Sequence, residues 1–517
     1  MNQTRHSEHP ARNLAALLAV CLSATMLGLE ISSIPAILPD LERILPADFR
    51  QLQWIVNAYT LAMASGLMAS GALADRFGRK RIFMIGIALF GLASLLCGLA
   101  PHAPELIAAR FLQGASGAAM LTCQIAVLSH QFRHGAQRSR AFAAWGITFG
   151  AGLGFGPLVG VLIAALAGWP WVFLIHVGLA VVTFGLAGWG IAESANPGLS
   201  RLDLPGMVTL SLAVFALVEV IIDGRAISAD NPAGLALAML GGLGIIAFVI
   251  IENRSTRPMF DFSVFRVKPF LGALIGSAGM NFSFWPFVIY LPIHLQAVLG
   301  LDAKAAGAML LAYTLPPLVV PPLAERLLAR HGPGTVIPLG LATIGTGFAL
   351  MLLAAYGRDA DWRALLPGCL LAGVGLGLTN TPVTNTSTGA LPPEQAGMAS
   401  AMDTSARIIS LSINIAVMGL ILVHGIRGAL EHLPLHGMQA TALDQLARTL
   451  AGGDLSAAGR IGSAGAHAAL LAGFQGVMLY AALCGWAMSV ISLLVFRQAP
   501  KAATAAPAPV GIELMMD

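Results

Sequence analysis

Long apolar runs alternate with short polar segments along the whole chain. Each run is roughly 17–27 residues long, the length at which an α-helix crosses the ~30 Å hydrocarbon core of a bilayer. About 14 runs can be counted, near residues 13–38, 54–73, 82–100, 105–129, 141–167, 171–192, 204–222, 232–251, 269–295, 304–324, 335–356, 364–386, 405–426 and 467–496. The pattern predicts an all-α polytopic membrane protein with both termini on one side.

The composition excludes a water-soluble protein. Of the 517 residues, 57% are hydrophobic and only 10% are charged, whereas about 25% of a soluble protein is charged. The net charge of +4 agrees with basic cytoplasmic loops and does not indicate a nucleic-acid partner. The cysteines lie within apolar runs, which favours buried core residues over a disulfide framework.

The sequence gives no support for an enzyme. A phosphate-binding loop of an ATP-driven pump needs Gly-Lys-Ser/Thr, and no lysine of this chain follows a glycine. The metal-ligand spacing of His and Cys is also missing, as are the signatures of nucleophilic catalysis and dinucleotide binding. We therefore expect no cofactor.

A charged segment at residues 71–81 separates the second and third runs and contains Asp75, Arg76, Gly78 and Arg79. Its basic excess marks the cytoplasmic side of the membrane. The segment resembles the motif G-x-L-a-D-r-x-G-r-k-x that the major facilitator superfamily carries between its second and third spans. The resemblance implies that these four residues gate conformational change, with Asp75 bonding neighbouring helix ends. A generic positive-inside loop is the alternative.

A weak internal repeat supports the same family. Residues 323–326 echo residues 73–76, eight runs later in the chain. A plain repeat of six would give 12 spans, so we expect two six-helix major facilitator bundles with two additional central spans, about 14 in all. The expected order is a cytoplasmic leader at 1–12, an N-terminal bundle at 13–192, a linker with the two additional spans at 193–268, a C-terminal bundle at 269–496 with an outer loop at 427–465, and a disordered cytoplasmic tail at 497–517.

The first run contains a carboxylate, Glu30, within the segment Leu29 to Pro39. This segment resembles the first-span signature L-D-x-T-x-V-x-x-A-L-P of the 14-span drug:proton antiporter branch, with Glu in place of Asp. A charged carboxylate in an apolar helix is costly, so it should face an aqueous cavity. We interpret Glu30 as the proton-coupling residue. A purely structural, hydrogen-bonded carboxylate is the alternative.

Arg110 in the fourth run is the expected partner of Glu30. Together with Gln113 it resembles the family pattern R-x-x-Q-G-x-g, and the two helices place Arg110 and Glu30 at compatible depths below the outer surface. An arginine beside the carboxylate would link protonation to conformation. The alternative is an arginine that reaches the outer headgroups.

The fifth run is rich in glycine. Gly150, Gly154, Gly156, Pro157 and Gly160 resemble the antiporter signature G-x-x-x-G-P-x-x-G-G. Small residues let helices approach closely and proline bends a helix, so the resemblance implies a pliable seam between the two bundles and export over uptake. Ordinary helix packing is the alternative.

Three further groups of residues carry expectations. Tyr59, Gln113, Phe284, Trp285 and Tyr290 could line a cavity that holds flat apolar molecules, although aromatics in membrane helices also face lipid. Asp403 and Arg407 lie four residues apart and could pair as an inner gate or act as an interfacial anchor. Glu219 in the seventh run is expected at the membrane surface.

One turn departs from the branch pattern. Trp169-Pro170-Trp171 replaces its W-R-W, and His176 stands where the branch usually has Asn.

The resemblance implies a multi-pass transporter of the cell (inner) membrane that exports lipophilic drugs or toxic small molecules in exchange for protons. We expect a monomer in contact with lipids, and an exporter of this kind could also engage a periplasmic adaptor protein. A dedicated metabolite exporter, an uptake symporter and a non-transporting sensor or scaffold are the alternatives.

Overall fold

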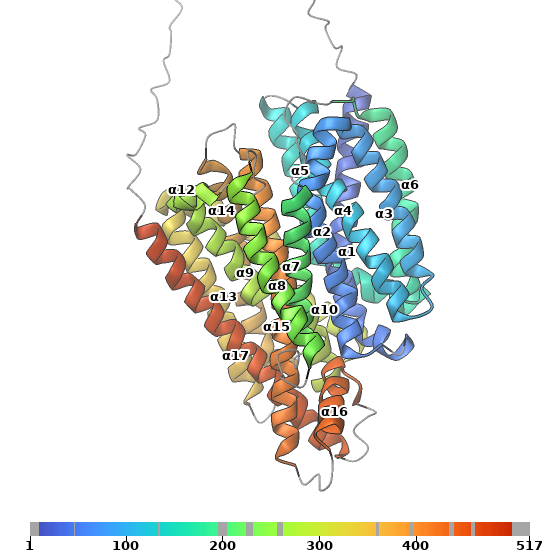
Figure 1. Cartoon of the computed structure of the whole chain (residues 1–517), viewed down its shortest axis with the longest axis vertical. Helices are drawn as coiled ribbons and strands as arrows, with labels where there is room; N and C mark the ends of the chain where they lie inside the picture. The colour runs from blue at the N-terminus through green and yellow to red at the C-terminus, as the bar shows by residue number, and fades with distance from the viewer. Residues whose placement is uncertain are drawn as a thin grey trace, which may run out of the picture.

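The computed structural model describes residues 10–45, 47–132, 135–194, 204–223, 231–255, 262–357, 361–391, 396–433, 439–455 and 461–498. All regular secondary structure in these ranges is helical (Figure 1). The first group of helices is α1 (Pro10–Ile44), α2 (Phe49–Phe77), α3 (Arg79–Gly98), α4 (Ala103–Gln131), α5 (Gly135–Ala167) and α6 (Pro170–Gly190). We call these six helices the N-bundle.

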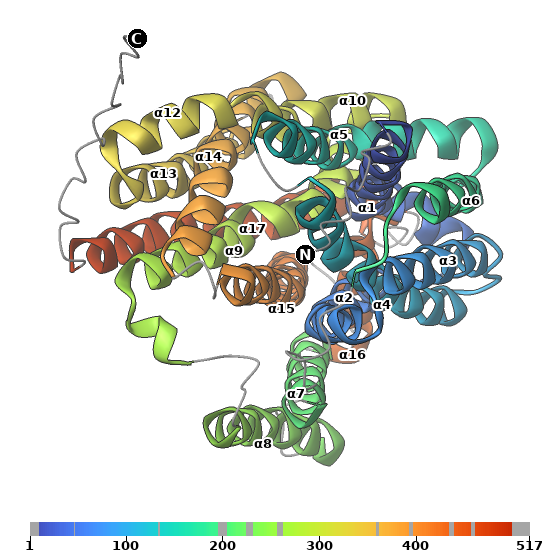
Figure 2. The same cartoon turned by 90° about the horizontal axis from the view of Figure 1, so that it is seen from above.

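The linker contributes α7 (Leu204–Asp223), α8 (Pro232–Arg254) and the short η1 (Phe262–Arg266). The remaining helices form the C-bundle: α9 (Lys268–Ile293) with its π-helical end η2 (His294–Val298), α10 (Ala303–Thr314), α11 (Pro316–Val319), α12 (Pro321–His331), α13 (Pro333–Ala355), α14 (Trp362–Gly389), α15 (Ala396–Glu431), α16 (Ala440–Gly452) and α17 (Gly462–Arg497). Figure 2 shows the two bundles side by side, with α7 and α8 outside them.

Eleven described helices are long and apolar enough to cross a membrane, or 12 if the bent pair Ala303–Val319 and Pro321–His331 is one span. The 44° bend of that pair has a clear cause, because prolines interrupt the helical hydrogen bonds there. The apolar part of α7 is short, at Val208–Ile221. By length and composition alone the described helices therefore fall short of the expected 14 spans.

Several element ends differ from the sequence prediction. Helix α1 begins at Pro10, inside the expected leader, and continues beyond residue 38 to Ile44. The expected outer loop at 427–465 holds the end of α15 and all of α16, an amphipathic helix whose Leu443, Ala447 and Leu450 are buried. Arg497 ends α17 rather than beginning a tail. Residues 1–9 and 499–517 lie outside the described part of the chain.

The apolar core is shared by the two bundles at the α16 end of the molecule and divided at the opposite end. At the α16 end, one buried cluster runs from Ile34 and Ile55 of the N-bundle to Tyr290 and Ile415 of the C-bundle. At the opposite end, the buried members of the second cluster all come from α1 to α6 and the residues directly after α4 and α6. The bundles are therefore packed together mainly around the α16 end.

The glycines of α5 lie on two faces that contact different partners. A Cβ at Gly156 would lie 1.9 Å from the Ser32 hydroxyl oxygen of α1. A Cβ at Gly160 would likewise lie 2.6 Å from the Cβ of Ser33. These glycines therefore permit close packing inside the N-bundle, and the expectation that Gly156 lies between the bundles is wrong.

The other face of α5 does form the contact between bundles. Cβ atoms at Gly150 and Gly154 would lie 2.8 and 2.5 Å from the Leu318 side chain of α11, and the Thr314 hydroxyl donates to the Gly154 carbonyl at 2.7 Å. Only Gly150 and Gly154 of the glycine pattern therefore lie in the contact between the bundles. Gly156 does not, because residues two apart on a helix point in different directions. Pro157 lies within the helix.

Helix α7 packs against both α2 and α15 (Figure 2). Buried Val214 and Val218 of α7 join Leu61 of α2 and Ala416 of α15 in one small apolar cluster. At the end of this contact Glu219 accepts a hydrogen bond from the Trp54 indole at 2.8 Å and pairs with Arg50 of α2. Glu219 is therefore a paired and partly buried acid rather than a free one, and it ties α7 to the N-bundle. Helix α8 packs on the outer side of α7.

Candidate functional site

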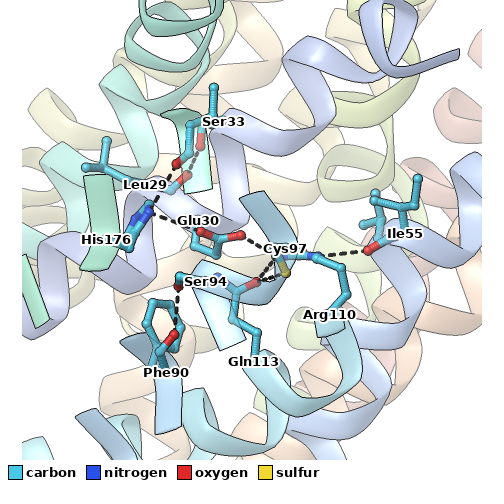
Figure 3. A network of polar contacts seen from close by, with 12 residues as sticks. Leu29, Glu30, Ser33, Ile55, Phe90, Ser94, Cys97, Arg110, Gln113 and His176 are labelled. Carbon is cyan, nitrogen blue, oxygen red and sulfur yellow. Dashed lines mark hydrogen bonds and ion pairs between the residues drawn. The ribbon is translucent and has the colours of Figure 1, made fainter. Parts of the chain in front are cut away.

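The centre of the N-bundle holds a buried ion pair between Glu30 of α1 and Arg110 of α4 (Figure 3). The exposed fractions are 0% for Glu30 and 1% for Arg110. Arg110 Nη1 donates to Glu30 Oε1. The helix continues from Glu30 to Ile44, a further ~21 Å at 1.5 Å per residue, so the carboxylate lies deeper than the sequence suggests.

The guanidinium of Arg110 is held by two further hydrogen bonds and an aromatic ring, in addition to the carboxylate. Its Nε donates to the Ile55 carbonyl oxygen of α2 at 2.9 Å, and Nη1 also donates to Gln113 Oε1 at 2.7 Å. The guanidinium carbon lies 4.4 Å from the centre of the Tyr59 ring. A desolvated contact of this kind contributes about 2 kcal/mol or more. Arg110 is therefore held inside the bundle and does not reach the headgroups.

Glycine explains why Arg110 can reach the backbone of α2. A Cβ at Gly114 would lie 2.1 Å from the Tyr59 carbonyl oxygen, so any side chain would push α4 and α2 apart. The close approach brings the Ile55 carbonyl within reach of the arginine one turn earlier on α4. The R-x-x-Q-G pattern is thus a single structural unit.

The ion pair belongs to a longer polar network. Gln113 donates through Nε2 to Ser94 Oγ of α3 at 2.9 Å, and Cys97 Sγ lies 3.7 Å from Gln113 Oε1. On the other side of the carboxylate, His176 Nδ1 of α6 lies 3.4 Å from Glu30 Oε2. Sequence reasoning named Glu30, Arg110, Tyr59 and Gln113. It missed Ser94, Cys97 and the role of His176, although an ionisable residue inside an apolar run was a usable signal.

The expected cavity residues do not line an open cavity in this conformation. Tyr59, Gln113, Phe284 and Tyr290 are at most 1% exposed, and Trp285 is half-buried. Phe284 stacks on Tyr313 with ring centres 4.0 Å apart. The aromatic side chains of α9 thus pack against other helices of the C-bundle, because burying large apolar area stabilises that packing.

Tyr290 instead takes part in hydrogen bonds that join the two bundles near the α16 end. Gln53 Nε2 of α2 donates to Tyr290 Oη at 3.1 Å and to the Ile415 carbonyl of α15 at 3.3 Å. The hydroxyl oxygens of Thr60 and Ser412 lie 2.8 Å apart. All four side chains are buried, so each bond must be broken or replaced if α2 separates from α15.

The contact between Thr60 and Ser412 can be tested with an engineered disulfide. In a Thr60→Cys, Ser412→Cys double variant we expect mild oxidant to form the cross-link, because the two replaced atoms are already in contact. The product is measured by mass spectrometry of proteolytic fragments. A matched Thr60→Cys, Ser410→Cys pair should remain reduced, since Ser410 points to another side of α15. Equal cross-linking of the two pairs would mean that α2 and α15 do not meet as described.

The charged segment at residues 71–81 contains the junction of α2 and α3. Gly78 adopts a φ of 112°, a region that favours glycine, and Arg76 is exposed over the Phe77 ring. The N-terminus of α3 is capped by an acid the sequence analysis did not name: Glu193 accepts from the backbone N–H groups of Lys80 and Arg81 at 3.0 and 3.2 Å. The side chain of Asp75 lies outside the described residues.

Arg79 also belongs to this junction, because its backbone N–H donates to the Ser194 carbonyl at 2.9 Å. The segment after α6 is therefore fastened to the start of α3. A carboxylate at a helix N-terminus is favourable because the unpaired N–H groups carry partial positive charge. The contact joins the start of α3 to the end of α6, at the end of the N-bundle opposite α16.

Asp403 and Arg407 pair at 3.0 Å along α15. Asp403 accepts from the Ser277 hydroxyl of α9, and Arg407 donates to Asn380 and to Thr384 of α14. These partners all belong to the C-bundle. In this conformation the pair therefore fastens three helices of one bundle together and does not bridge the two bundles.

The chain matches the family model of the Major Facilitator Superfamily over residues 20–414. It is 31% identical over 418 residues to the multidrug resistance protein Stp of Mycobacterium tuberculosis, covering 81% of this chain and 77% of that protein. It is also 31% identical to the tetracenomycin C resistance and export protein of Streptomyces glaucescens, with 78% and 75% covered.

Solved structures agree on the fold. A bacterial homologue of the human lysosomal transporter Spinster superposes with a TM-score of 0.60 at 16% identity, over 95% of this chain and 98% of the other. A D-xylose-proton symporter gives a TM-score of 0.56 at 13% identity, over 92% and 97%. The helical architecture, the family model and the relatives together confirm the family expected from the sequence, and the chain belongs to the Major Facilitator Superfamily of membrane transporters.

Proposed function

We propose that this transporter is a proton-coupled antiporter that exports lipophilic small molecules across the cytoplasmic membrane. The observation that carries the proposal is the buried Glu30–Arg110 pair. An ionisable pair inside a membrane bundle is costly to bury, so its presence calls for a function, and a carboxylate that gains and loses a proton is the simplest one. Multidrug resistance among the relatives supports the substrate class.

We infer that α7 and α2 also cross the membrane, giving 14 spans, and that the end opposite α16 faces the cytoplasm. The basic residues Lys80 and Arg81 lie at that end, as the positive-inside rule requires. Since the bundles share their core at the α16 end, the described conformation is then closed toward the outside. The segment with Asp75, Arg76, Gly78 and Arg79 and the Asp403–Arg407 pair would stabilise the inner ends of the bundles in the other state.

The geometry suggests how proton and substrate alternate. Ile34 and Ile55 lie in the shared apolar core next to Glu30 and Arg110, so packing of the two bundles excludes water from the carboxylate on the outer side. Separation of α2 from α15 would open that side and let a proton reach Glu30. Protonation removes the charge that Arg110 neutralises, which changes the balance between the two conformations. Substrate that binds the other conformation better shifts the same balance in the opposite direction. Proton and substrate then weaken each other's binding, and by linkage this effect is reciprocal.

A transport assay in everted membrane vesicles tests the proposal. With an imposed pH gradient, acid inside, we expect vesicles containing the protein to accumulate ethidium or tetraphenylphosphonium, two lipophilic cations, and a protonophore to abolish the accumulation. Vesicles without the protein are the control. Accumulation that persists after the gradient is collapsed, or that fails for every probe, would contradict the proposal.

A dedicated exporter of one compound is the second candidate. It is favoured by relatives named for single antibiotics, such as the puromycin resistance protein of Streptomyces alboniger, which is 31% identical over 409 residues. The same assay separates the candidates, because a dedicated exporter would move one compound of a broad panel and none of the others. We expect a monomer in either case, and a periplasmic adaptor is not needed for transport across the cytoplasmic membrane.

A further inference from the structure

His176 lies directly beside the second oxygen of Glu30 and is 1% exposed (Figure 3). Its Nδ1 lies 3.1 Å from the Val172 carbonyl oxygen one turn earlier on α6. Within the described residues, His176 Nε2 and Glu30 Oε2 are both buried without a hydrogen-bond partner. The Tyr59 hydroxyl, on the ring that Arg110 contacts, also lacks a partner there, so the ion pair lies among unsatisfied polar atoms.

The contacts of His176 define its hydrogen positions. A carbonyl oxygen only accepts hydrogen bonds, so Nδ1 carries the hydrogen and points it at Val172. The neutral ring then has its lone pair on Nε2, the atom that has no partner among the described residues. Histidine is the side chain that ordinarily changes charge between pH 5 and 8. The ring is therefore ready to accept a proton at Nε2.

The surroundings of His176 contain one acid and one base. Glu30 faces it from α1, and Arg110 of α4 lies on the far side of that carboxylate. Phe90 of α3 presents its ring at 5.9 Å, and Cys97 of the same helix lies against Gln113. The neighbouring stretch of α5, residues 158–165, has no ionisable residue.

We propose that His176 is a second proton-binding residue of the Glu30 site, which takes the first proton at Nε2 while Glu30 stays ionised and paired with Arg110. This inference rests on the proposed antiport function. A proton delivered by water could otherwise go only to Glu30, which would leave the buried Arg110 uncompensated. On His176 the same proton produces a cation that the carboxylate touches, so Glu30 stays between two positive groups. A second proton can neutralise Glu30 only after the bundles separate and water reaches Arg110 and His176.

Histidine NMR tests the inference without transport. In nanodiscs with ¹⁵N-labelled histidine, we expect one signal, absent from His176→Asn, to change from the neutral Nδ1–H form to the charged ring as the pH is lowered. In Glu30→Gln the same change should need a lower pH, because the facing charge is gone. A ring that stays neutral throughout, or is indifferent to Glu30→Gln, would overturn the proposal.

Transport supplies the second measurement. We expect drug-driven proton release to fall in His176→Asn from two protons per substrate toward one, and accumulation of ethidium in vesicles to require a more acidic lumen. His294→Gln is the matched control. His294 is likewise buried and has one ring nitrogen, Nδ1, without a partner among the described residues, but no acid pairs with it there. Equal proton counts in His176→Asn and wild type would overturn the inference. Absence of drug-driven proton release from the wild-type protein, with the NMR titration intact, would refute antiport and leave the proton site standing.

Discussion

The Glu30→Gln variant is expected to lose proton-driven accumulation entirely while it is still inserted, folded and able to bind substrate. Glutamine keeps the size of the side chain and can still accept from Arg110, but it cannot bind a proton and release it again. Drug transport driven by a pH gradient should therefore fall to the level of empty vesicles. Substrate binding, measured by tryptophan fluorescence in detergent, should change by less than about tenfold, or 1.4 kcal/mol.

Glu219→Gln is the matched control for Glu30→Gln. Glu219 is also an acid in a helix of the membrane region paired with an arginine, Arg50, but it lies between α7 and α2 rather than within the N-bundle. Its variant should retain proton-coupled accumulation. Wild-type proton release by the Glu30→Gln protein would remove Glu30 from the mechanism.

Arg110→Met is expected to be the most destabilising single change at the site. It leaves Glu30 buried without its cation, and removing one partner of a buried pair costs about 3–5 kcal/mol. We expect a large fall in the thermal unfolding midpoint in detergent at neutral pH. Acidic pH should restore part of the loss, because protonation of Glu30 removes the uncompensated charge.

A second substitution separates charge from packing. The double variant Arg110→Met, Glu30→Gln should unfold at a higher temperature than Arg110→Met alone, because no buried charge remains. Arg110→Lys keeps the charge but cannot bond Ile55, Gln113 and Glu30 with one planar group, so an intermediate midpoint is expected. A double variant no more stable than Arg110→Met would mean that Arg110 acts through packing and not through its charge.

The sequence predicted the helices and the Glu30–Arg110 pair for physical reasons. Apolar runs of membrane length admit few structures other than helices, because backbone groups must be bonded internally. Two opposite charges inside such runs must likewise find each other or water, so compatible depth together with the family pattern R-x-x-Q-G-x-g was enough to pair Glu30 with Arg110. The ends of the helices were harder to predict from the sequence. The continuation of α1 to Ile44 depends on packing against neighbouring helices, which one sequence does not display.

Other predictions failed because the sequence does not show the direction in which a side chain points. Gly154 and Gly156 are two residues apart, and only the structure shows that one faces α11 while the other faces α1. The aromatic residues of α9 could equally have faced a cavity, lipid or another helix, and Tyr290 lies in a bond between bundles instead. The role of Glu193 could not be predicted for another reason: it caps a helix that is distant in sequence.

The position of α7 has a consequence for compounds dissolved in the bilayer. Two bundles that rock against each other have two lateral seams, and each is a potential entrance from the lipid. Along one seam α7 covers the junction of α2 and α15 and is fastened by Glu219. The other seam, where Gly150 and Gly154 meet Leu318, has no such cover among the described helices. Helices α7 and α8 therefore make the two lateral seams different. A lipophilic compound would enter from the bilayer only through the seam between α5 and α11.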